Sequence, residues 1–117
     1  MREELEQRLL LRWPEWFDIQ GFEHGDGWFD ILWRLCVDLE PLAEGLEGEG
    51  RTPFEVVRVR EEGGGLHVYV NGGTDAICER IEAAQEESFR TCEVCGQPGL
   101  RRRNHWVRIR CDEHAEE

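Results

Sequence analysis

Apolar positions recur at helical spacing in two N-terminal stretches of the chain. Residues 1–12 form the first, and we expect this helix to stop at Trp13, because Pro14 disfavours helical geometry in the residue before it. Residues 28–40 form the second, where Asp26 or Gly27 is placed to cap the start and Pro41 to end or kink the helix. The apolar face of this second helix consists of Trp28, Phe29, Leu32, Trp33, Leu35, Cys36 and Leu39.

The pattern changes to alternation further along the chain, which is typical of strands with one buried face. Residues 54–60 and 66–70 predict a hairpin joined by the glycine-rich turn 61–65. A third helix over 75–89 follows, with Thr74 as its N-cap. The inward residues of this helix are predicted to be Ile77, Ile81, Ala84 and Ser88.

This order of elements predicts an α+β fold, a small antiparallel sheet covered by helices, with a C-terminal zinc-ribbon or zinc-knuckle module. We expect residues 1–90 to form an acidic α+β domain. Residues 91–117 are expected to form the metal module, packed on that domain.

The charge of the chain is strongly negative but uneven. Its 117 residues carry a net charge of −12, and the sequence contains no lysine, so all 14 basic residues are arginine. Residues 92–117 hold five arginines and five acids and are neutral, so the excess acidity lies in residues 1–91. Such a protein repels nucleic acid and membranes unless its positive charges gather on one face.

Four residues near the C-terminus have the spacing of metal ligands. Cys92 and Cys95 form a Cys-x2-Cys pair, Cys111 and His114 form a Cys-x2-His pair, and fifteen residues separate the pairs. A Cys3His set closes the tetrahedral coordination of Zn²⁺ without leaving a position for water, so we expect one structural zinc ion per chain. A redox Cys-x-x-Cys site and an iron–sulfur centre are the weaker alternatives, since the motif here follows a helix instead of opening one.

Five arginines lie between the two ligand pairs, on a predicted hairpin. Alternation along its second strand places Val107 and Ile109 inward and Trp106, Arg108 and Arg110 outward, joined by Arg101, Arg102 and Arg103. Guanidinium groups beside an indole suit phosphates and bases. The favoured alternative is that these arginines pair with acids of the preceding domain or of a partner protein.

A second polar cluster is predicted near residues 23–30, from Glu23, His24, Asp26 and Asp30. A histidine beside carboxylates suits acid–base chemistry or a second metal ion. The favoured interpretation is a turn in which Asp26 caps the following helix. Cys36 and Cys78 lie on apolar helix faces, and we expect both to be buried.

Three segments resemble a family of small uncharacterised proteins of bacteria, phages and prophages. They are "GDGWFDILWRLC", the stretch from "FEVVRVREEGGGLHVYV" to "AQEESFRTCEVCG", and "CDEH". The resemblance implies a zinc-knuckle α+β protein, often carried by phages, and no particular activity. Relatives often place a lysine and an aromatic residue before "GGL", whereas "REEGGGL" here has neither.

The sequence favours a non-enzymatic zinc protein that acts by binding another macromolecule. Its acidity and the phage-like resemblance suggest an inhibitor or modulator of a host or defence protein with a basic nucleic-acid-binding groove. The alternatives are a nucleic-acid-binding zinc ribbon and an enzyme centred on His24 and Asp26. The chain shows neither a signal peptide nor an apolar run of 18 residues, so we expect a cytoplasmic protein that does not act at a membrane.

Overall fold

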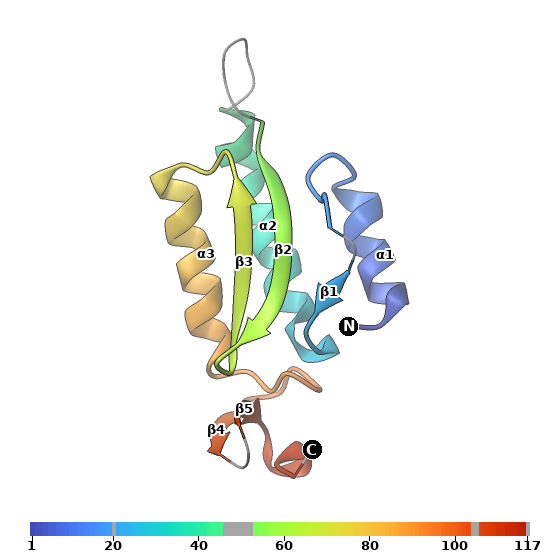
Figure 1. Cartoon of the computed structure of the whole chain (residues 1–117), viewed down its shortest axis with the longest axis vertical. Helices are drawn as coiled ribbons and strands as arrows, with labels where there is room; N and C mark the ends of the chain where they lie inside the picture. Colours follow the sequence, from blue (N-terminus) through green and yellow to red (C-terminus); the bar gives the residue numbers. More distant parts are fainter. Residues whose placement is uncertain (20, 46–52, 104–105, 117) are drawn as a thin grey trace.

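A computed structural model describes residues 1–19, 21–45, 53–103 and 106–116 of the chain. Helices and small sheets share one elongated body that measures 51 × 28 × 21 Å along its principal axes. Figure 1 shows a long hairpin of β2 (Glu55–Glu62) and β3 (Gly65–Asn71) at its centre. The C-terminal hairpin of β4 (Leu100–Arg103) and β5 (Val107–Arg110) lies at one end of the long axis. The predicted α+β class is confirmed.

The N-terminal helices form where the apolar periodicity predicts them. Helix α1 spans Glu3–Arg12 and ends at Trp13, as expected from Pro14. A short 3-10 turn, η1, covers Asp26–Trp28 and leads into α2, which spans Phe29–Glu44. Neither Asp26 nor Gly27 caps α2, so that prediction is wrong: Trp28 holds the N-cap position and makes no side-chain cap hydrogen bond.

Pro41 does not end α2, which continues for three more residues to Glu44. A proline within a helix removes the hydrogen bond that its N–H would donate four residues back, here to the carbonyl of Val37. Val37 is 43% exposed, so water can satisfy that carbonyl. Ala43, beyond the proline, is buried in the core and gives the last turn a packing partner.

The main sheet has three strands in the order β1-β2-β3. Strands β2 (Glu55–Glu62) and β3 (Gly65–Asn71) form the predicted antiparallel hairpin. Gly63 and Gly64 form its two-residue turn with φ values of 59° and 94°, as a type I′ turn requires. The short strand β1 (Phe22–Glu23) pairs with β2 in parallel, so the expectation of a purely antiparallel sheet is wrong.

Helix α3 spans Asp75–Ser88 and packs along β3 and α2 (Figure 1). The Thr74 hydroxyl accepts the backbone N–H of Ile77, which confirms the predicted cap. The predicted inward stripe is also confirmed, with Ser88 buried and donating its hydroxyl to the carbonyl of Gln85.

The core joins all three helices to the sheet. Its aliphatic residues come from α1, α2, β2, β3 and α3, and its aromatic residues are Trp13, Phe22, Trp28, Phe29 and Phe54. The largest fully buried members are Trp28, Leu9, Leu32, Leu39, Leu66 and Ile77.

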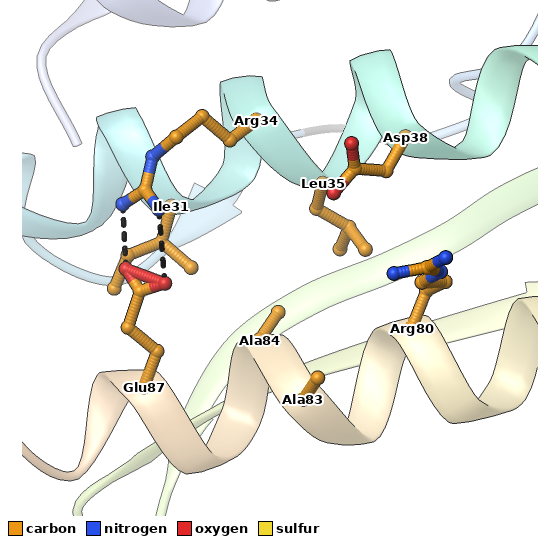
Figure 2. A pocket seen from close by; sticks show the side chains of 8 residues that line it. All are labelled: Ile31, Arg34, Leu35, Asp38, Arg80, Ala83, Ala84 and Glu87. Atoms are coloured by element: carbon orange, nitrogen blue, oxygen red, sulfur yellow. Dashed lines mark hydrogen bonds and ion pairs between the residues drawn. The ribbon is translucent and has the colours of Figure 1, made fainter.

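A small cavity of about 100 Å³ lies between α2 and α3. Figure 2 shows Arg34 among the lining residues, with its guanidinium facing the Glu87 carboxylate on α3. Two hydrogen bonds of 3.0 and 2.5 Å join these groups. Arg34 therefore forms an ion pair that joins α2 to α3.

The C-terminal segment forms the predicted second hairpin, from β4 (Leu100–Arg103) and β5 (Val107–Arg110). A 3-10 turn, η2 (Asp112–His114), follows it. The expected hairpin turn, with Asn104 and His105, lies outside the described residues. The division of the chain into a domain of residues 1–90 and a metal module of residues 91–117 stays a prediction.

Candidate metal centre

Cys92, Cys95, Cys111 and His114 converge, and their candidate ligand atoms all lie within 4.8 Å of one another. The Sγ atoms of Cys95 and Cys111 are 3.6 Å apart, and Nδ1 of His114 lies 3.8 Å from Cys92 Sγ. A disulfide bond would need about 2.05 Å between sulfurs. Ligands on a tetrahedral zinc ion, at about 2.3 Å from the metal, have sulfurs about 3.8 Å apart, close to the separation found here.

Local backbone geometry turns the first pair of ligands toward one point. The N–H of Cys92 donates to the carbonyl of Gln97 at 2.8 Å, and the N–H of Gly96 donates back to the carbonyl of Cys92 at 2.9 Å. Gly96 has a φ of 82°, which a residue with a Cβ adopts only with strain. The sequence therefore needs glycine directly after the Cys-x2-Cys pair.

The second pair is held by the end of β5 and by η2. Cys111 directly follows β5, and the N–H of His114 donates to the Cys111 carbonyl at 3.2 Å, which closes the short turn. This turn brings His114 Nδ1 to 3.1 Å from Cys111 Sγ. The fifteen-residue spacer acts as a hairpin that returns the second pair to the first.

The surroundings of Cys92 favour its thiolate. Burial alone would raise the pKa of this thiol. The backbone N–H groups of Cys111, Cys95 and Val94 outweigh burial and lower the pKa from 9.0 to about 7. At Cys95 the pKa is raised: the N–H of Gln97 acts to lower it, but partial burial and the neighbouring thiols of Cys111 and Cys92 prevail. The cluster thus supplies one ready thiolate, and a cation is needed to hold three together.

This donor set fits a structural metal ion. Three sulfurs and one imidazole nitrogen match the softness and the four-coordinate geometry that Zn²⁺ takes in closed sites. All four positions are filled by protein atoms, so the set leaves no vacant position for a substrate or a catalytic water.

The five arginines of the hairpin do not form one outward face. Arg110 is only 5% exposed and donates from Nη1 to the Glu93 carboxylate at 3.2 Å, so its predicted outward position is wrong. Arg102 is half-buried and pairs with Asp112 at 2.9 Å. Ile109 is buried as predicted, and Val107 is partly buried. Alternation failed at Arg110 because a buried carboxylate compensates its charge.

Of the remaining arginines, Arg108 is half-buried beside Trp106. The indole of Trp106 is 63% exposed, and the Arg108 guanidinium lies 5.1 Å from the centre of its ring. Arg101 and Arg103 are exposed and form no ion pair with any other described residue. The predicted basic and aromatic surface therefore lacks Arg110, and a role of the other residues in binding stays a prediction.

The polar cluster of residues 23–30 is divided among separate partners. Glu23 pairs with Arg58, and Asp26 pairs with Arg2 at 2.8 Å. His24 is 6% exposed and its Nδ1–H donates to the carbonyl of Gly25 at 2.8 Å. Asp30 is exposed on α2. These side chains do not converge on one ligand position.

Of the two cysteines outside the metal cluster, only Cys36 is buried. Burial raises the pKa of its thiol to about 12, which makes it an inert core residue. Cys78 is exposed on α3, so the expectation that it is buried is wrong.

Sequence reasoning missed the residues that connect the metal cluster to the main domain. Glu93, between the first two ligands, is 8% exposed. The backbone N–H of Gly27 donates to the Glu93 carbonyl at 2.7 Å, and the indole of Trp28 donates to the carbonyl of Thr91 at 3.0 Å. The one sequence signal for these contacts was the Gly-Asp-Gly stretch at 25–27, which predicts a turn but not its contacts with the metal cluster.

Comparison of the chain with protein-family models, with curated proteins and with solved structures gave no match. The family resemblance of the sequence therefore rests on its three segments alone. No helix in the described part of the chain combines the length and apolar composition that a membrane crossing requires.

Proposed function

We propose that this chain is a non-enzymatic interaction protein, in which a structural Zn²⁺ ion stabilises a scaffold that presents an acidic helix to a basic partner protein. The Cys3His cluster supports the first part. The acidic outer face of α3 is the observation that carries the second.

Four carboxylates line that outer face. Asp75, Glu79, Glu82 and Glu86 follow one another at spacings of four, three and four residues, and all are exposed. At about 100° per residue they fall within about 60° of each other around the helix, opposite the buried stripe. None of them forms an ion pair with another described residue. We call these four residues the acidic stripe.

A rigid row of uncompensated carboxylates is suited to a groove lined with lysine and arginine. Complementary charge speeds encounter and disfavours partners of the same sign. A groove built for nucleic acid is such a surface, so occupation by α3 would inhibit a polymerase or nuclease of the host. Association would weaken with salt, because the stripe is solvent-exposed.

The test compares three immobilised, zinc-loaded proteins in host extract. The first is unchanged, and the second carries Asp75→Asn, Glu79→Gln, Glu82→Gln and Glu86→Gln. The third is a matched control that removes four exposed carboxylates elsewhere through Glu4→Gln, Glu15→Gln, Asp18→Asn and Glu44→Gln.

We expect a nucleic-acid-binding protein that the unchanged chain and the control retain, that the stripe variant loses, and that duplex DNA displaces. Equal retention by the stripe variant would contradict the proposal. So would the capture of no protein by any of the three.

Nucleic-acid binding by the hairpin is a second candidate, favoured by the contact between the exposed Trp106 and the half-buried Arg108. An indole can stack on a base while Arg101, Arg103 and Arg108 contact phosphates. With these three contacts to a single strand, the logarithm of the binding constant should fall with log salt at a slope of about −2. Fluorescence anisotropy with labelled single-stranded DNA measures it, and Trp106→Ala must abolish binding if the second candidate is correct.

A further inference from the structure

Glu93 is the point at which three separate segments of the chain meet. Its carbonyl accepts the N–H of Gly27 at 2.7 Å, and its own N–H donates to the carbonyl of Ile109 at 3.1 Å. Its carboxylate accepts the N–H of Gly25 at 2.9 Å and the guanidinium of Arg110 at 3.2 Å. One residue between two metal ligands therefore binds both the start of η1 and the end of β5.

Arg110 extends this connection to the second ligand pair. It directly precedes Cys111, and its side chain is buried with that of Glu93. A buried ion pair contributes little net stability compared with apolar residues of the same size. Removing either partner, however, leaves an uncompensated buried charge. The Glu93–Arg110 ion pair is thus better suited to fixing the relative position of the two ligand pairs than to stabilising the fold.

The turn of residues 25–27 leaves no room for side chains on its glycines. A Cβ on Gly27 would clash with the carbonyl of Cys92 and lie 2.6 Å from the N–H nitrogen of Gly96. A Cβ on Gly25 would lie 3.1 Å from the side chain of Glu93 and clash with its carbonyl. Directly after the turn, the indole of Trp28 donates to Thr91, the residue before the first ligand.

We propose that Glu93 and Arg110 are positioning residues of the metal centre, and that the 25–27 turn, more than sixty residues before the first ligand in sequence, holds them in place. Metal affinity then depends on the contact between this turn and the Cys-x2-Cys segment. The inference rests on the structural metal ion of the proposed function and is independent of the acidic stripe.

The first test changes the turn without touching a ligand. Gly27→Ala places a methyl group against Cys92, whereas Gly21→Ala, the matched control, meets nothing within 4 Å. Zinc affinity is measured by competition with a chromophoric chelator. We expect Gly27→Ala to lower it about 10- to 100-fold, as loss of supporting contacts does at metal sites, and Gly21→Ala to leave it unchanged.

The second test keeps the backbone intact and examines the carboxylate. Glu93→Gln retains an acceptor for Gly25 but loses the charge opposite Arg110, and Glu93→Ala loses both. We expect the zinc affinity to be highest in the unchanged chain, lower in Glu93→Gln and lowest in Glu93→Ala. The visible absorption bands of bound Co²⁺ should shift in both variants, because they report ligand geometry and not fold stability.

Wild-type zinc affinity and cobalt spectra in both Gly27→Ala and Glu93→Gln would overturn the positioning role while leaving the metal centre intact. Failure of the unchanged chain to bind either ion would overturn the metal centre itself, and this inference with it.

Discussion

His24 shows how its surroundings assign a residue its role. The ring packs 5.8 Å from that of Trp28 and 6.1 Å from that of Phe22. Among the described residues, its Nε2 atom is buried without a hydrogen-bond partner. Burial lowers the pKa of His24 from 6.5 to about 4, although the hydrogen bond to Gly25 opposes this change. A neutral, enclosed imidazole is a core residue at neutral pH.

This pKa makes folding sensitive to acid. Between pH 6.5 and about 4 the unfolded chain binds a proton on His24 that the native state does not, so the free energy of unfolding falls as pH falls through this range. The full pKa shift corresponds to about 3 kcal/mol in the free energy of unfolding. Urea unfolding at pH 7 and pH 4.5, with excess zinc, should show a smaller loss of stability for His24→Phe than for the unchanged chain. An equal loss in both proteins would show that other groups cause the acid sensitivity.

At the scale of elements, the contact between α2 and α3 combines an exposed ion pair with a buried apolar seam. Arg34 and Glu87 form the ion pair, with side chains 60% and 34% exposed (Figure 2). Ile31, Leu35 and Ala84 form the seam below it, and all three are buried. An exposed pair gains little because water screens its charges, whereas a buried apolar side chain contributes both its removal from water and its packing contacts.

We therefore expect Arg34→Ala to lower the free energy of unfolding by less than about 1 kcal/mol. Leu35→Ala should lower it by about 2–5 kcal/mol, because it removes buried apolar contacts of the seam and enlarges the space between the helices. Urea unfolding of both variants at neutral pH measures the two effects. A larger loss for Arg34→Ala would mean that the ion pair, and not the seam, holds the helices together.

Most features that are encoded within a few residues could be predicted: the helix periods, the Thr74 cap, a glycine-rich hairpin turn and the ligand spacing. The cap at Asp26 or Gly27 and the burial of Cys78 are local predictions that are wrong. Strand β1 was not predicted, because its parallel partner β2 lies more than thirty residues away in the sequence and no local pattern indicates the pairing. Arg110 was assigned to the wrong side for the same reason: only the folded chain brings Glu93 beside it.

At the scale of the whole molecule, the metal module closes one end of the elongated body. Besides the contacts of Glu93, the side chain of Val107 lies against Gly64 at the tip of the β2–β3 turn. The central core includes none of the four candidate ligands. The helices and the β2–β3 hairpin therefore have their own apolar contacts, and we expect a bound ion to add to stability instead of creating the entire fold.

The melting temperature should accordingly rise with zinc concentration. At free zinc one hundred times the dissociation constant, preferential binding to the native state adds about 2.7 kcal/mol to the free energy of unfolding. Cys95→Ser should remove this dependence because it deletes a ligand. Cys78→Ser, which changes the other exposed cysteine, should retain it. Thermal melts followed by circular dichroism across a zinc series measure both variants.

If Cys95→Ser still responded to zinc like the unchanged chain, the ion would bind elsewhere. If helical signal vanished at room temperature on chelation, the core would depend on the metal more than its apolar contacts indicate.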